Sequence, residues 1–156
     1  MMSGDGTGSL YVDDKEGVTA WVERFFFAGV ELSVLSTPAF VVAYLAQALY
    51  PDTVPIAGLA AIGAGSISLA VYRARTVDVG GWPRRGEFST LPLRVAHFSL
   101  VFLIACVAVG AAAGEAGNWG MAFLSGGAAE VLGLGLFPRV YRAVHGDPFR
   151  KPAERA

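Results

Sequence analysis

Glu130 is the side chain of this sequence whose position most needs a chemical explanation. It lies about eleven residues from either end of a long apolar run, so roughly 16 Å deep in a membrane-spanning helix at about 1.5 Å per residue. A charge at that depth costs at least about 2.5–3.5 kcal/mol. A carboxyl group that gains and loses a proton there could serve a proton or cation route. The structural alternative is a neutral acid bonded to a backbone carbonyl, to Ser66 or to Ser68.

The neighbours of Glu130 in the sequence predict that it faces other helices and not lipid. Glycines stand at i−4, i−3 and i+3 on its own helical face, and small residues recur every four positions in an earlier apolar run. Small residues let membrane helices approach closely. The predicted helix-packing positions are Gly126, Gly127, Gly133, Ala57, Ala61 and Gly65. Glu130 should therefore point into a helix interface, where burial favours its neutral form.

A second group of ionisable side chains is predicted nearer the end of two other helices. Glu31 lies roughly 9 Å into the first apolar run, and His97 lies near the start of the third, one turn after Arg94. A Glu31–His97 or Glu31–Arg94 pair would lower the free energy needed to bury either partner. The functional interpretation is a vestibule in which His97 titrates near neutral pH. The alternative is a structural hydrogen bond, or side chains that extend to nearby headgroups.

Other chemistry finds little support in the residue patterns. A single cysteine, Cys106, excludes an internal disulfide, a CxxC redox pair and a cysteine zinc site. The two histidines, His97 and His145, are far apart and form no metal pattern. Phosphate-binding glycine loops, HExxH and GxSxG are absent from the sequence. We therefore expect no cofactor, no metal and no catalytic residue, and a membrane enzyme is the least favoured class.

The elements that position these residues are four apolar runs. The chain is 54% hydrophobic and 16% charged, with a mean hydropathy of +0.50, which a soluble domain of this length rarely shows. The predicted fold class is an all-α integral membrane protein: an antiparallel four-transmembrane-helix bundle in one domain at residues 13–147. Pro38 should kink the first helix. The predicted spans are about 25–49, 54–72, 93–114 and 119–141.

The segments outside the spans are predicted separately. Residues 1–12 should form a disordered tail and residues 148–156 a flexible one. Val18, Trp21, Val22 and Phe25 share one helical face after an N-cap signal at Asp13 and Asp14, which predicts a short interfacial amphipathic helix before the first span. The alternative is that these residues are the solvated first turns of a longer helix.

The basic residues predict an orientation. All twelve Lys and Arg residues fall on one side of the four runs, and none falls in the turns at 50–53 and 115–118. By the positive-inside rule, both termini and the middle loop are cytoplasmic in a multi-pass plasma-membrane protein. The composition, with ten Arg, two Lys and much Ala, Gly and Val, is typical of a prokaryote with a GC-rich genome.

Two functions remain open at this stage. The first is a transporter or channel-like component or an oligomeric membrane subunit, with Glu130 as its protonatable group and a homo-oligomer enclosing the pathway. The second is a non-catalytic scaffold that binds another membrane subunit through small-residue helix faces. The lipid bilayer is a partner in both. Nucleic acid is not, because the net charge is −1.

Overall fold

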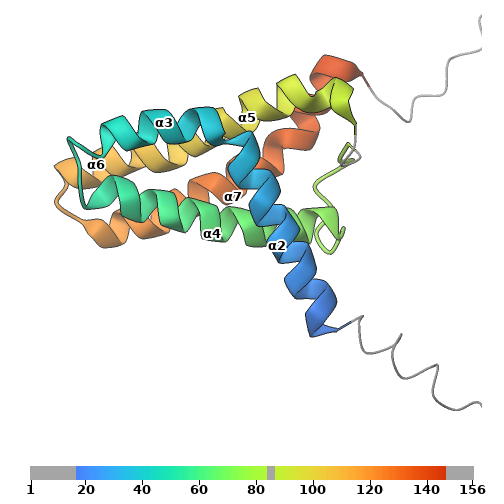
Figure 1. Ribbon diagram of the computed structural model, residues 1–156, viewed down its shortest axis with the longest axis horizontal. Helices are drawn as coiled ribbons and strands as arrows, with labels where there is room; N and C mark the ends of the chain where they lie inside the picture. The colour runs from blue at the N-terminus through green and yellow to red at the C-terminus, as the bar shows by residue number, and fades with distance from the viewer. Residues whose placement is uncertain (1–16, 84–86, 147–156) are drawn as a thin grey trace, which may run out of the picture.

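The computed structural model describes residues 17–83 and 87–146, and every regular element in these ranges is helical. The helices in chain order are α2 (Val18–Leu35), α3 (Thr37–Ala46), α4 (Thr53–Arg73), η2 (Phe88–Thr90), α5 (Leu91–Leu103), the π-helical turn η3 (Ile104–Ala108), α6 (Val109–Glu115) and α7 (Trp119–His145). Figure 1 shows α3, α4, α7 and the α5–α6 rod along the long axis, with α2 projecting at an angle. The predicted tails and the Asp13–Asp14 cap lie outside the described residues.

Three helices of the described ranges are long and apolar enough to cross a membrane: Thr53–Arg73, Phe88–Glu115 and Trp119–His145. The predicted spans 54–72, 93–114 and 119–141 fall within them. The pair α2 and α3 adds a fourth candidate only if both helices are counted as one span, because they are bent by 70°. The all-helical class is confirmed for residues 17–83 and 87–146, with three or four candidate spans. The count of four stays a prediction.

The first apolar run, 25–49, does not form the single helix that the sequence predicted. The helix that begins at Val18 continues past Phe25 and ends at Leu35, so Val18–Phe25 is the first part of α2 and not a separate element. Pro38 lies in the first turn of α3 and has no N–H to donate. In a continuous helix its ring would also clash with the backbone carbonyl group one turn earlier. The predicted kink is therefore a break.

The break is stabilised by two hydrogen bonds with α5. The Ser99 hydroxyl donates to the carbonyl oxygen of Leu35 at 3.0 Å, and the Ser36 hydroxyl donates to the carbonyl oxygen of Phe98 at 3.4 Å. A helix end that is buried needs such partners for its unpaired carbonyls. The bend between α2 and α3 is thus held by the third span.

The most extensive packing among the described helices joins α4 to α7, and we call it the α4–α7 seam. A Cβ added at Gly126 would lie 2.8 Å from the carbonyl oxygen of Ala57, and one at Gly127 would lie 3.5 Å from that of Ala60. Ala57 and Ala61 are fully buried. These small residues therefore let the backbones of α4 and α7 approach so closely that a glycine hydrogen fits between them but a Cβ does not.

The helix from Phe88 to Glu115 packs against the seam through one glycine of the seam and one of its own. Gly133 of α7 faces the side chain of Val101 on α5, and a Cβ at Gly110 of α6 would lie 2.8 Å from the Cα of Val54. The Cys106 thiol, in the π-helical turn, is directed at the carbonyl oxygen of Val54 at 3.5 Å. A π-helical turn widens the helix by one residue and is frequent at functional sites.

The two ends of the packed helices differ in chemistry. At one end, which we call the turn end, the turns at 47–52 and 116–118 lie together, and the Tyr50 hydroxyl donates to Glu115 at 2.6 Å. The other end, which we call the basic end, holds Arg73, Arg94 and Arg142. Here the loop after α4 folds back, so that the Trp82 ring lies 5.1 Å from the Phe137 ring. This end is sealed by aromatic rings and arginines.

Candidate functional site

Glu130 lies on α7 in the α4–α7 seam and is fully buried. A Cβ added at Gly65 of α4 would lie 2.8 Å from the Cγ of Glu130 and 2.7 Å from Leu32 of α2. Leu32 and Leu134 are also fully buried, so three helices close around the glutamate side chain. Because Gly65 has no side chain, it leaves room for the side chain of Glu130.

The Glu130 carboxyl group has no hydrogen-bond partner for either oxygen among the described residues. The structural interpretation named two serines of α4, but both bond their own helix. Ser66 donates to the carbonyl oxygen of Ile62 at 2.7 Å, and Ser68 donates to that of Gly65 at 3.0 Å. This is the usual way in which serine is satisfied inside an apolar helix. Glu130 is therefore a buried acid whose carboxyl oxygens find no hydrogen-bond partner among the described residues.

Glu31 lies at the basic end and is bound by two arginines. Arg94 of α5 and Arg73 of α4 both donate through Nη2 to Oε1 of Glu31. The side chains of Glu31, Arg73 and Arg94 are 11%, 11% and 5% exposed. Charge-assisted hydrogen bonds of this kind are about twice as strong as neutral ones. The ionic cluster Glu31–Arg73–Arg94 therefore holds α2 to α4 and α5.

Arg73 is the member of this cluster that the sequence analysis missed as a site residue. Its guanidinium lies 5.5 Å from the centre of the Trp82 ring and donates to the carbonyl oxygen of Pro83 at 3.4 Å. Its position at the basic end of the second span, at the depth predicted for Arg94, was the available signal. The 70° bend that carries Glu31 across α4 was not visible in the sequence.

His97 does not join the ionic cluster. Its Nε2 lies 3.0 Å from the carbonyl oxygen of Gly133, and its ring lies 5.2 Å from that of Phe137, both on α7. Three residues advance a helix by about 300°, so His97 points about 60° away from Arg94. The predicted Glu31–Arg94 pair is present, whereas a Glu31–His97 pair is not formed. His97 instead links α5 to the helix that carries Glu130.

An apolar groove of about 680 Å³ runs between α3 and α4. The residues that shape it include Phe40, Tyr44, Gly58, Ile62, Phe102 and Cys106. Cys106 lines this groove, and Ala129, the residue before Glu130, packs against the same apolar cluster as Cys106. The groove and the residue next to the buried carboxyl group therefore share one layer of the core.

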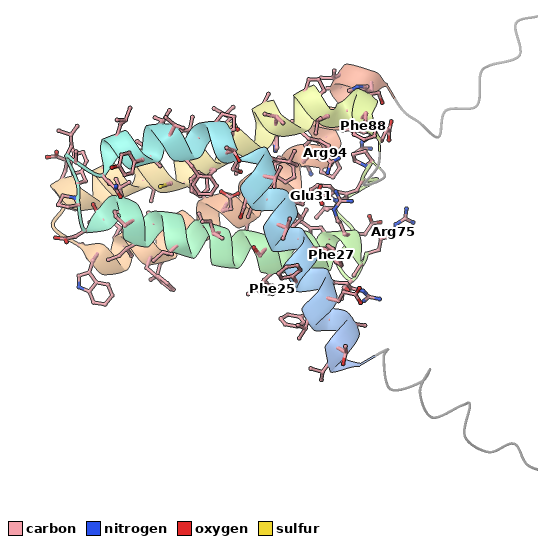
Figure 2. The ribbon with its side chains drawn as sticks, viewed as in Figure 1. Phe25, Phe27, Glu31, Arg75, Phe88 and Arg94 are labelled. Atoms are coloured by element: carbon pink, nitrogen blue, oxygen red, sulfur yellow. The ribbon has the colours of Figure 1, made fainter. Side chains whose placement is uncertain are left out.

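A smaller cavity of about 310 Å³ lies beside the ionic cluster, between α2 and the start of α5. Glu31 and Arg94 line it on one side. Its other walls are apolar and come from Phe27, Val30, Val34, Leu35 and Leu91. Figure 2 shows Glu31 and Arg94 next to each other at this place, with Phe27 further along α2 and Arg75 pointing away from the helices. The cavity thus combines a charged wall with apolar walls.

Metal binding finds no support in the described part of the chain, where no three His, Cys, Asp or Glu side chains gather.

Comparison with known proteins places most of the chain in one family. A family model described as a domain of unknown function, DUF8215, matches residues 15–144. No curated protein and no solved structure matches the chain. The matched range includes the ionic cluster, the α4–α7 seam and Glu130, so these features belong to the family domain.

Proposed function

Since the chain belongs to the DUF8215 family, which carries no assigned activity, we propose from the geometry that it is a proton-carrying transport component of a membrane, with Glu130 as the group that takes up and releases the proton. The observation that supports this function is the buried carboxyl group without a hydrogen-bond partner among the described residues. The two buried serines of α4 nearest in sequence to its contact with Glu130, Ser66 and Ser68, do form hydrogen bonds.

The physical argument concerns what the carboxyl group needs in its two protonation states. An ionised carboxylate without donors is far harder to bury than a neutral acid. Release of the proton from Glu130 therefore requires water or a new donor, and no described side chain of the packed seam donates to the carboxyl group. Opening of the α4–α7 seam and loss of the proton become one coupled step.

Access to Glu130 is proposed from the groove between α3 and α4. Pockets of roughly 300–1,000 Å³ are typical of small-molecule sites, and this groove has about 680 Å³. The π-helical turn at Cys106 lines the groove, and Ala129, next to Glu130 in the chain, packs against the same apolar cluster. A shift of this turn to a regular α-helix would move the wall and connect the groove to the carboxyl group.

We propose the following placement in the membrane. The basic end faces the cytoplasm of a plasma membrane, because the basic residues avoid the turn end. The pair α2 and α3 completes a four-span bundle, with the exposed apolar side chains of α2, such as Trp21, Val22 and Phe26, in the cytoplasmic interface. Four spans enclose little space, so a complete pathway requires a homo-oligomer.

Proton flux into vesicles tests the proposal. Purified protein in liposomes with a trapped pH-sensitive dye, driven by a potassium diffusion potential, should move protons faster than protein-free liposomes. Glu130→Gln keeps the shape and removes titration, so flux should fall to the protein-free rate. Glu115→Gln removes a carboxyl group at the turn end and should leave flux unchanged. Wild-type protein without flux, or a Glu130→Gln variant with full flux, would show that the proposed function is wrong.

A membrane scaffold is the second candidate, and the open groove between α3 and α4 favours it. The faces predicted for partner binding, at Ala57, Ala61 and Gly65, are occupied by α7 within the chain, so a partner helix would have to use the groove. Co-purification of one membrane protein in fixed ratio, lost in a Gly58→Phe variant that fills the groove, would support the scaffold. It would do so only if the purified chain moves no protons.

A further inference from the structure

A pocket of about 300 Å³ lies at the turn end, where the turn that leads into α4 meets the turn that leads into α7 (Figure 1). The residues that line it include Tyr50, Asp52, Thr53, Gly114 and Trp119. A pocket of this volume is at the lower limit of small-molecule sites, so it has room for a ligand of few atoms. The proposed role of Glu130 does not involve this end of the molecule.

Two polar side chains of this pocket make no hydrogen bond with the described chain. Thr53 is only 7% exposed, and its hydroxyl oxygen has no partner among the described residues. This oxygen faces Gly114, where an added Cβ would lie 2.8 Å from it. Asp52 is the N-cap residue of α4, but its side chain forms no capping hydrogen bond, whereas Asn118 accepts one from the backbone N–H of Met121 in α7. A carboxylate and a buried hydroxyl group are therefore both left for a ligand.

The described part of the turn end also has no basic residue that could neutralise Asp52. The sequence contains no Lys, Arg or His at positions 25–72 or 98–138, and the turns at 47–52 and 116–118 lie within these stretches. Glu115, whose carboxylate accepts the hydrogen bond from Tyr50, lies outside the pocket lining. The charge of Asp52 is therefore complementary to a positively charged ligand from solution.

We propose that this pocket binds a small organic ammonium cation. A protonated amine has as many as three N–H donors, so it can donate to the carboxylate of Asp52 and to the hydroxyl oxygen of Thr53 together. Tyr50 and Trp119 add aromatic rings to the pocket lining, and a cation is attracted to the face of such a ring. A ligand of this class gives both unused polar groups a partner.

The apolar part of the lining favours an organic cation over a metal ion. Leu49 and Pro51 line the pocket beside the polar groups, and their side chains can cover an alkyl chain but have no atom that could coordinate an ion. Within residues 17–83 and 87–146, no three His, Cys, Asp or Glu side chains gather as a metal site would require.

Binding of n-propylammonium chloride to the full chain in detergent tests the proposal, followed by NMR of labelled tyrosine rings. The ring signal of Tyr50 should move in a saturable way, whereas those of Tyr72 and Tyr141, near the basic ends of α4 and α7, should not. 1-Propanol has the same alkyl chain without the charge, and it should produce no saturable shift. Sodium chloride at the same ionic strength should produce none either.

Two variants separate ligand binding from a structural role. Asp52→Asn keeps the shape and removes the charge, so the dissociation constant should rise about tenfold. Thr53→Val removes a hydroxyl group that has no partner within the described chain, so it should raise the dissociation constant about fivefold without lowering the thermal midpoint. Glu23→Gln removes an exposed carboxylate of α2, outside the pocket, and should leave binding unchanged.

The proposal would be overturned if Tyr50 of the wild-type protein did not respond to n-propylammonium, or if 1-propanol or sodium chloride reproduced the response. An unchanged dissociation constant in Asp52→Asn would overturn it as well. So would a lower thermal midpoint in Thr53→Val, because the hydroxyl group would then have a structural partner.

Discussion

Glu31 and Glu130, the two acidic side chains of the described helices that are not exposed to solvent, have opposite surroundings. Glu31 is bound by arginines from two other helices at the basic end. Glu130 is fully buried in the α4–α7 seam, and its oxygens find no hydrogen bond among residues 17–83 and 87–146. The one acid connects helices, and the other is only enclosed by them.

This difference indicates that Glu31 stabilises the structure, whereas the presence of Glu130 is not explained by stability. An ion pair that is mostly buried is strongly destabilised when one partner is removed, because the other charge stays behind. A buried polar group that makes no hydrogen bond lowers stability as long as it is present. Replacement of the two residues should therefore change stability with opposite signs.

The largest effect is expected for Glu31→Ala. It leaves Arg73 and Arg94 next to each other without their shared carboxylate, which should lower the free energy of unfolding by roughly 3–5 kcal/mol. Unfolding by a denaturing detergent measures this change. Glu23→Ala removes an exposed acid from the same helix and serves as the control. If Glu31→Ala and Glu23→Ala lowered the free energy of unfolding equally, Glu31 would not stabilise the structure through its arginine partners.

A smaller effect of the opposite sign is expected for Glu130→Met. Methionine has a similar length and no polar atom to leave unpaired, so the free energy of unfolding should rise by about 2 kcal/mol. The same unfolding experiment measures it. Loss of stability in this variant would mean that the carboxyl group has a partner and that the contrast with Glu31 is false.

Gly126→Ala tests the other half of the comparison. Around Glu130, close packing between the backbones of α4 and α7 stabilises the structure, whereas around Glu31 the ion pairs do so. The new Cβ would lie 2.8 Å from the carbonyl oxygen and 2.9 Å from the Cα of Ala57, so the helices must separate. We expect a loss of at least about 1 kcal/mol, measured as a lower thermal midpoint. In Gly63→Ala the new Cβ meets nothing within 4 Å, and this variant should not be destabilised.

The smallest effect concerns an acid at the turn end. The hydrogen bond from the Tyr50 hydroxyl to Glu115, together with the carboxylate charge, raises the pKa of that phenol above its ordinary value. Because the pKa is raised in the folded protein, the contribution of this bond is present below the unfolded value of about 10 and is lost as the pH rises further. Glu115→Gln should lower the pKa of Tyr50, as measured by NMR of labelled tyrosine rings. An unchanged pKa would exclude the contact.

Much of the α4–α7 seam was predictable from the sequence. Apolar length located the helices that contain 54–72, 93–114 and 119–141, and the glycines around Glu130 indicated that another helix covers its face. These features are local, since they depend on the periodicity of one helix and on side-chain size.

The ionic cluster was predictable only in part. Glu31, Arg94 and His97 were expected at similar depth, with Glu31–Arg94 and Glu31–His97 as alternative pairs, but Arg73 was not included. The structure forms the pair with Arg94, and His97 makes a hydrogen bond with the carbonyl oxygen of Gly133. The choice between partners depends on the direction of α2, which turns by 70° at the break before Pro38. A proline predicts that a helix is interrupted, but it does not predict the angle at which the two parts then pack.

The sequence by itself determined that the chain is helical and apolar, that basic residues avoid one end, and that one acid lies midway along its last helix. These properties follow from composition and helical period, which each segment carries alone. The tertiary structure decided which acid is paired, where the groove between α3 and α4 and the smaller cavity beside Glu31 lie, and that α4 closes over Glu130. Those outcomes depend on how segments far apart in the chain pack against each other, and no single segment encodes that geometry.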